Sequence, residues 1–183
     1  DLRLDAFASI MFLLVTGIGT LVLLYATRYF GAATPGLPRL AGLLLIFTGA
    51  MLGVVTASNL LVLFVAWELT SISSYLLIGW DDTNPVGRSS ALQALLTTGA
   101  GGLALLGGFV LIGEAAGTYD IAALATRPPT GTSVSVGLVL VLIGAFTKSG
   151  QFPFSAWLPG AMVAPTPISA FLHSATMVKA GVY

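Results

Sequence analysis

The sequence predicts an all-α integral membrane fold with about six transmembrane helices, the fifth of which is discontinuous. Of the 183 residues, 56% are hydrophobic and only 8% are charged, whereas a soluble globular domain carries about 25% charged residues. Long uncharged stretches reach the roughly 20 residues that a helix needs to cross the hydrocarbon core. The chain begins at Asp1 without an initiator methionine and stops at Tyr183 within an apolar pattern. We therefore expect residues 1–183 to form a single membrane domain that is an internal piece of a longer polytopic protein.

The composition also argues against several classes of function. Seven basic and seven acidic residues give a net charge of zero, so the sequence lacks the basic excess that nucleic-acid binding requires. The chain has no cysteine and a single histidine, His173. This leaves no thiolate or multi-histidine metal site, and no second group that would complete a catalytic triad. We predict no catalytic residues, no metal and no cofactor.

The first three helices are predicted at 6–28, 40–57 and 60–80. Two prolines and a glycine at 34–38 form the first loop, because proline cannot donate a backbone hydrogen bond and glycine favours turns. Residues 40–80 contain one charge, Glu68, and as a single helix would run about 60 Å, roughly twice the hydrocarbon core. This stretch must therefore fold back once, and Ser58 or Asn59 could cap the helix that begins at residue 60.

The remaining helices are predicted at 89–113, 134–160 and 167–183. The first of these is rich in glycine, and its pairs Thr98–Gly102 and Ala104–Gly108 place small residues four apart, which favours close helix contact. Asp120 begins a short interfacial helix in the polar connection that follows. The helix at 134–160 is expected to break near 148–153, where glycine and proline interrupt it. Irregular backbone at membrane depth is tolerated only inside protein or beside water, and such breaks mark ion sites in transporters.

Four ionisable residues inside these segments are the candidate proton-transfer groups: Glu68, Lys148, His173 and Lys179. A charge at membrane depth costs about 3 kcal/mol or more unless water or a partner compensates it, so such residues are functional candidates. Each candidate also has a structural alternative. Glu68 could be ion-paired or neutral and hydrogen-bonded, Lys148 could extend to the lipid headgroups, and His173 could serve only in packing. Trp67 and Trp157 are expected to flank this polar centre.

Glu68 and Lys148 are predicted to act as a pair. Burial disfavours a charged lysine and a nearby carboxylate favours it, so a change in their separation would switch the proton on Lys148. Ser71 and Tyr75 follow Glu68 at positions i+3 and i+7 and are expected to support it from the same helix face. On the last helix, three polar residues are expected to form one stripe that holds water or passes a proton: Ser169, His173 and Thr176.

Two motifs carry a resemblance to a known family. AWELTSISSYLLIGW (Ala66 to Trp80) and TKSGQFPFSAWLPGAMVAPTPISAFLHSATMVKAGVY (Thr147 to Tyr183) resemble the antiporter-like membrane subunits of respiratory complex I, membrane-bound hydrogenases and multisubunit Mrp cation/proton antiporters. The glycine-rich helix that begins near Ala91 and the lysine at position 179 look most like the large A-type subunit of the Mrp antiporters. The resemblance implies inverted five-helix repeats, each with a broken helix.

The same resemblance implies roles for the candidate residues. Glu68 would be the family's helix glutamate, Lys148 its broken-helix lysine, and His173 with Lys179 the link toward a central polar axis. The function expected is a proton-translocating subunit of a multisubunit monovalent cation (Na⁺)/proton antiporter, a secondary transporter rather than an enzyme. Its partners would be other membrane subunits, the bilayer, protons and monovalent cations, in a prokaryotic cell membrane.

Two alternatives stay open at this stage. One is a proton-pumping membrane subunit of an NADH-quinone oxidoreductase or membrane-bound hydrogenase, in which electron transfer supplies the energy. The other is a structural membrane scaffold with inert charges.

Overall fold

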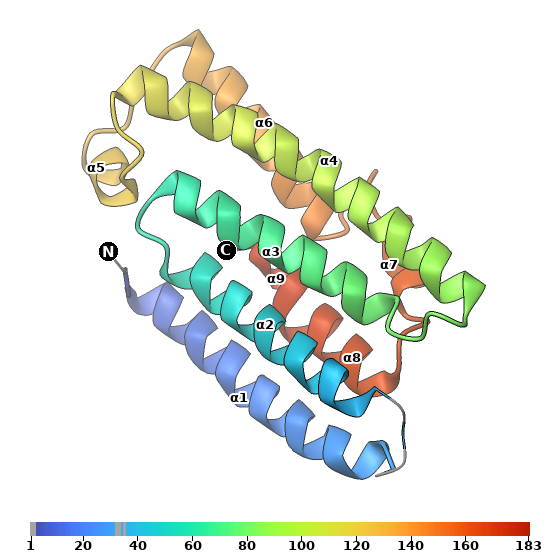
Figure 1. Cartoon of the computed structure of the whole chain (residues 1–183). Coiled ribbons are helices and arrows are strands. Elements are labelled where there is room, and N and C mark those ends of the chain that lie inside the picture. The colour runs from blue at the N-terminus through green and yellow to red at the C-terminus, as the bar shows by residue number, and fades with distance from the viewer. Residues whose placement is uncertain (1–2, 32–33, 35) are drawn as a thin grey trace.

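Four helices in the described part of the chain are long and apolar enough to cross a membrane: α1 (Ala6–Tyr29), α2 (Leu37–Thr56), α3 (Leu60–Ile78) and α4 (Pro85–Ala116). The computed structural model describes residues 3–31, 34 and 36–183, so Pro35 in the predicted first loop lies outside the described residues. The four helices lie side by side in chain order across the bundle (Figure 1). No β-strand occurs among the described residues, and the predicted all-α membrane fold is confirmed.

Side-chain caps mark the starts of α1, α3 and α4. Asn59, one of the two residues predicted to cap α3, accepts a hydrogen bond from the Leu61 backbone N–H at 2.8 Å. The α4 helix was predicted to begin at residue 89 but begins at Pro85. Asn84 accepts from the first-turn amides, and a proline in the first helical position needs no hydrogen bond there.

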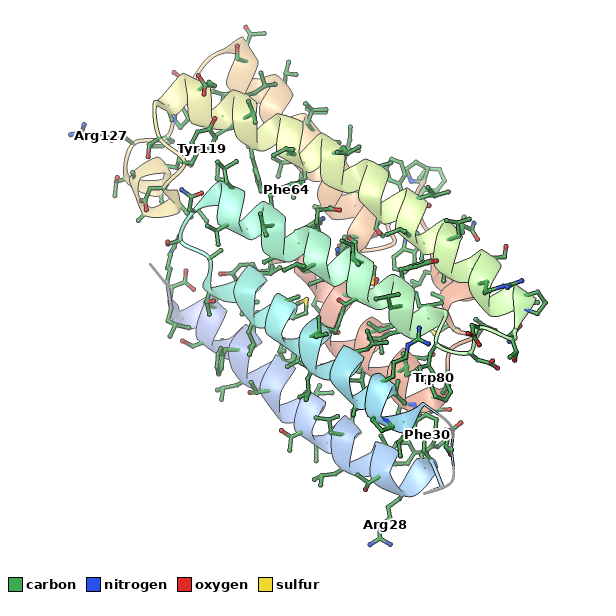
Figure 2. All side chains as sticks on the ribbon, in the orientation of Figure 1. Arg28, Phe30, Phe64, Trp80, Tyr119 and Arg127 are labelled. Atoms are coloured by element: carbon green, nitrogen blue, oxygen red, sulfur yellow. The ribbon has the colours of Figure 1, made fainter. Side chains whose placement is uncertain are left out.

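Two arginines mark the two ends of the bundle (Figure 2). Arg28 and Trp80 lie at one end, and Arg127 and Tyr119 lie at the other. This distribution is typical of a membrane protein, whose charges and amphipathic aromatic rings gather at the two interfaces. The connection after α4 contains α5 (Ile121–Thr126), the predicted short helix, and Asp120 caps it by accepting from the Ala123 N–H at 2.7 Å.

The predicted fifth helix is discontinuous. Its first part is α6 (Thr132–Lys148), and a short α7 (Trp157–Ala161) follows the break. Gly150 adopts a left-handed conformation (φ 61°) directly after the helix end. The Gln151 amide donates to the Phe146 carbonyl at 2.9 Å, and the Gly150 amide donates to the Thr147 carbonyl at 3.3 Å. This Schellman arrangement ends α6 at membrane depth while it satisfies two of its last carbonyls.

The predicted last helix is interrupted. It consists of α8 (Thr166–Ala170), a π-helix η1 (Phe171–Thr176) and α9 (Met177–Ala180). The expected last helix at 167–183 therefore contains a π-helical turn. The side chain of Phe171 is buried, lies with its ring centroid 5.6 Å from that of Phe47 in α2, and occupies the space beside Gly19 of α1. This packing places the π-helix in the interior, against α1 and α2.

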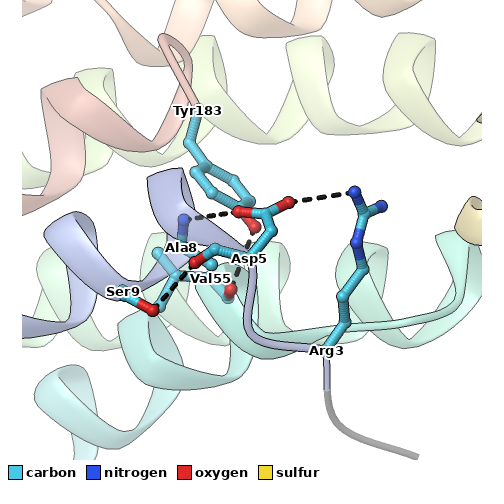
Figure 3. A network of polar contacts seen from close by, with 6 residues as sticks. All are labelled: Arg3, Asp5, Ala8, Ser9, Val55 and Tyr183. Atoms are coloured by element: carbon cyan, nitrogen blue, oxygen red, sulfur yellow. Dashed lines mark hydrogen bonds and ion pairs between the residues drawn. The ribbon is translucent and has the colours of Figure 1, made fainter.

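The two ends of the described chain meet at one edge of the bundle (Figure 3). Asp5 caps α1 and forms an ion pair with Arg3 at 2.9 Å. Beside this pair, the Tyr183 hydroxyl donates to the Val55 carbonyl at 2.9 Å. The contact joins the segment after α9 to the end of α2, and so closes the bundle around α3.

Candidate functional site

Lys148 is the centre of the candidate site. It is the last residue of α6, and its side chain is fully buried, with 0% exposure. Its Nζ donates to the Trp67 carbonyl at 2.9 Å and to the Ser71 hydroxyl at 2.6 Å, and lies 4.9 Å from the centroid of the Trp67 ring. All three contacts come from α3. The predicted alternative, a lysine that extends to the headgroups, is therefore wrong for this structure.

The Trp67 backbone carbonyl in α3 accepts hydrogen bonds from two side chains. In addition to Lys148, the Thr70 hydroxyl donates to it at 2.7 Å. The neighbouring hydroxyls of Ser73 and Ser74 are also buried and donate to carbonyls of their own helix. An ammonium group in a membrane is tolerated when such dipoles replace water. The short hydroxyl-rich stretch of α3 supplies this environment.

Glu68 lies on the same turn of α3 but points elsewhere. Its side chain is half-buried, and its Oε1 atom is buried without a hydrogen-bond partner among the described residues. The carboxylate occupies the space over Gly102 of α4. Arg3 with Asp5 is the only ion pair within 4.0 Å among the described residues, so Glu68 and Lys148 lie farther apart than that.

The break in the predicted fifth helix is held by Trp157. This buried side chain donates its indole N–H to the Thr147 carbonyl at 2.9 Å, which connects α7 to the residue next to Lys148. The Trp157 ring also lies 6.0 Å, centroid to centroid, from the ring of His173 on η1. Both predicted tryptophans therefore flank the polar centre, Trp67 beside Lys148 and Trp157 between Lys148 and His173.

His173 belongs to a second polar group. Its ring is partly buried, and neither ring nitrogen makes a hydrogen bond of ordinary geometry among the described residues, although the Ala161 backbone interacts with it. His173 and Ser169 line the same open pocket of about 450 Å³. Thr176 does not line it, because the π-helix turns its hydroxyl inward to donate to the Phe171 carbonyl at 2.6 Å. The structure therefore brings Ser169 and His173 to one pocket and directs the Thr176 hydroxyl to the Phe171 carbonyl.

Two further candidates, Lys179 and Tyr75, lie on α9 and α3. Lys179 is exposed on α9. Tyr75 is half-buried and lines a separate small pocket with Arg39, Asp82 and Arg88, at the opposite end of α3 from its start at Leu60. The support of Glu68 by Tyr75 from the i+7 position stays a prediction. The structure brings together Glu68, Ser71 and Lys148 as one group, and Ser169 with His173 as another.

Sequence reasoning missed the role of the backbone and of two glycines. The Trp67 carbonyl cannot be read from a residue type, since every residue carries one. The close packing at Gly101 and Gly102 could have been predicted in part, because the pairs of small residues four apart indicate close contact between helices. The close contact is confirmed: a Cβ atom at Gly108 would lie 2.5 Å from the Gly137 carbonyl of α6, so the two helices touch backbone to backbone there. The pattern did not reveal which side chains occupy that space.

The arrangement favours proton chemistry over metal or nucleophilic chemistry. Among the described residues, no three His, Cys, Asp or Glu side chains are grouped to hold a metal ion. A buried lysine and a buried carboxylate on different helices can each gain or lose a proton. Their charge states depend on the distance between them and on the water that reaches them.

The fold and the site define a multi-pass membrane protein with ionisable residues buried between its helices. Residues 57–183 match the family model described as NADH:quinone oxidoreductase/Mrp antiporter, TM, and residues 1–39 match that of the NADH-Ubiquinone oxidoreductase (complex I), chain 5 N-terminus. The chain belongs to this NADH:quinone oxidoreductase/Mrp antiporter transmembrane family. The predicted resemblance is confirmed.

Relatives of the chain include antiporter subunits. It is 52% identical over 189 residues to a protein of Rhizobium meliloti named as a probable K(+)/H(+) antiporter subunit of the A/B type, covering 100% of this chain and 18% of that one. It is 50% identical over 182 residues to the A-type Na(+)/H(+) antiporter subunit of Alkalihalophilus pseudofirmus, covering 98% of this chain and 23% of the relative. The chain thus spans about a fifth of the length of the curated relatives it matches.

A solved structure has the same fold. The chain superimposes on a chain in the structure of the Mrp complex from Dietzia sp. DQ12-45-1b with a TM-score of 0.91 and 44% sequence identity. The match covers 100% of this chain and 20% of the other.

Proposed function

We propose that this chain forms part of a proton-translocating subunit of a multisubunit monovalent cation/proton antiporter in a prokaryotic cell membrane. The observation that carries the proposal is the burial of Lys148 at the break after α6, where Trp67 and Ser71 of α3 hold its ammonium group. Residues of these types at membrane depth are expensive to keep and are characteristic of proton pathways. The antiporter subunits among the relatives support the same function.

The proposed mechanism depends on the separation of Lys148 and Glu68. When α3 and α6 bring the two side chains together, the carboxylate favours the charged lysine, and when they move apart, Lys148 releases its proton more readily. The structure has the separated arrangement, in which Lys148 binds neutral oxygens of α3. A proton released there would pass toward His173 beside Trp157, and then toward Lys179 and the rest of the protein.

We assign the transport of the cation to the whole complex and not to this chain alone. One relative is named for K⁺ and the other for Na⁺, although they are similarly identical to this chain. We propose sodium or another monovalent cation as the exchanged ion, and other membrane subunits as the partners. The protein would then be a secondary transporter that uses one ion gradient to drive the other.

Exchange measured in vesicles tests this function. The complete complex is placed in vesicles with an imposed pH gradient, no electron donor is present, and sodium or potassium is added. We expect the cation to dissipate the gradient. Proton movement that requires NADH or another electron donor would contradict antiport and would favour the redox-driven alternative. No proton movement under either condition would favour a structural scaffold.

A further inference from the structure

Two adjacent glycines of α4 touch the two halves of the proton-transfer pair. Gly101 and Gly102 are buried and face different helices. A Cβ atom at Gly102 would overlap Glu68 Oε1 and approach its Cδ to 3.0 Å. A Cβ atom at Gly101 would lie 2.6 Å from the Cβ of Thr147, the residue before Lys148. Both positions therefore exclude any side chain while Glu68 and α6 keep their places.

The contact at Gly102 is specific to that position. Gly99 lies in the same helix, three residues earlier, and a Cβ atom there would meet nothing within 4 Å. Alanine would favour the helix by about 1 kcal/mol over glycine at either position. The requirement for glycine at position 102 therefore comes from the carboxylate above it and not from the helix itself.

Packing against Gly102 constrains where the Glu68 carboxylate lies. Its Oε1 atom is buried and accepts no hydrogen bond among the described residues. An atom without a hydrogen bond is placed by the space that its neighbours leave, and here that space lies over the Gly102 Cα. A single added methyl group would fill it.

We propose that Gly102 is a positioning residue that determines the place of the Glu68 carboxylate and hence its distance from Lys148. This inference rests on the proposed role of Glu68 and Lys148 in proton transfer. Gly101 complements it, because its contact with Thr147 places the end of α6 against the same turn of α4. Gly101 and Gly102 together therefore position both Lys148, through the end of α6, and the Glu68 carboxylate.

The principal test compares Gly102→Ala with Gly99→Ala in the complete complex. We expect Gly102→Ala to lower the rate of cation/proton exchange by about tenfold or more, since displacements of about 1 Å can have effects of this size. It should also shift the pH at which exchange is half-maximal. Gly99→Ala should keep the wild-type rate and pH profile. The amount of assembled complex is measured for both variants, and rates are normalised to it.

Rescue distinguishes positioning from general damage to the helix. In the double variant Gly102→Ala with Glu68→Asp, the shorter side chain withdraws the carboxylate from the added methyl group. We expect the double variant to exchange faster than Gly102→Ala alone. A double variant no faster than the single one would contradict the proposal. So would Gly102→Ala with wild-type rate and pH profile.

A third measurement does not depend on transport. The chain has no native cysteine, so Glu68→Cys with Gly102→Cys places one reactive pair across the α3–α4 interface. We expect a short thiol cross-linker to join this pair in the complex and not to join Glu68→Cys with Gly99→Cys. Equal cross-linking of both pairs would contradict the contact.

If the wild-type complex moves protons only with an electron donor, the proposed antiport function is wrong. Gly102→Ala is then compared with wild type for donor-driven proton pumping, and the same loss of rate is expected.

Discussion

Lys148 of α6 donates a hydrogen bond to the hydroxyl of Ser71 of α3 at 2.6 Å, across 77 residues of sequence. The contact directs the ammonium group into the protein and away from the membrane surfaces. The Glu68 carboxylate, three residues before Ser71 in α3, occupies the space over Gly102 of α4. In the proposed mechanism, the Ser71 hydroxyl and the Trp67 carbonyl compete with Glu68 for the Lys148 side chain.

Substitution of Ser71 tests this competition. In Ser71→Ala a buried ammonium loses one of two acceptors, which costs about 1.5–3 kcal/mol for a hydrogen bond to a charged group. We expect cation/proton exchange to fall by about tenfold or more, because about 1.4 kcal/mol corresponds to a factor of ten. Ser71→Thr keeps the hydroxyl and should retain most of the activity. The measurement is the exchange rate in vesicles per assembled complex.

Ser73→Ala is the matched control for Ser71. Ser73 is buried in the same helix, and its hydroxyl donates only to the Leu69 and Thr70 carbonyls of that helix. Its loss should leave exchange near the wild-type rate. Equal losses in Ser71→Ala and Ser73→Ala would mean that the contact with Lys148 has no role of its own.

The break after α6 depends on the backbone of Gly150. Its φ of 61° is disfavoured for residues with a side chain by about 1–2 kcal/mol, and asparagine tolerates it better than alanine. We expect the thermal midpoint of the complex to fall in Gly150→Ala and to fall less in Gly150→Asn. Gly42→Ala in α2, where a Cβ would meet nothing within 4 Å, should not lower it. A midpoint unchanged by Gly150→Ala would show that the αL turn is not needed.

Residue types in an apolar sequence were sufficient to find the main members of the site. Glu68 and Lys148 stand out because charge is rare at membrane depth, and Gly150 and Pro153 mark the break because they interrupt helices. The helix starts at Asn59 and Asp120 follow local capping rules. These features depend on neighbours in sequence, so they could be predicted.

What could not be predicted depends on contacts between helices. The π-helix at Phe171–Thr176 moved Thr176 away from His173, and nothing in the spacing of polar residues indicates an i to i+5 turn. Tyr75 has the helical spacing of a partner for Glu68, yet it lines another pocket near Arg39 and Arg88. The glycines of α4 predicted close contact but not that Glu68 would fill the space over Gly102.

A group outside the membrane helices offers a test by pH. The Tyr119 hydroxyl donates to Glu114 at 3.0 Å, and this hydrogen bond, together with the negative charge of Glu114, raises the pKa of Tyr119 above its ordinary value of about 10. A raised pKa in the folded protein means that the contact stabilises the loop below the unfolded pKa. The stabilisation is lost as the pH rises through the folded pKa.

Tyrosinate absorbance measures this shift. The difference between the alkaline titrations of wild type and Tyr119→Phe isolates Tyr119, and we expect it to titrate above the ordinary tyrosine range. Glu114→Gln should return it toward that range, because the charge is removed. A difference titration at the ordinary pKa in wild type, or one that Glu114→Gln leaves unchanged, would contradict the contact.

The most direct test of the proposed proton route is the exchange rate of the complete complex with Lys148→Ala, in vesicles and without an electron donor. Lys148 joins the break after α6 to the Ser71 hydroxyl of α3 and is the proposed partner of Glu68. The proposal predicts that exchange falls to the background rate while the complex still assembles in wild-type amount. Wild-type exchange in Lys148→Ala would contradict the route through this site.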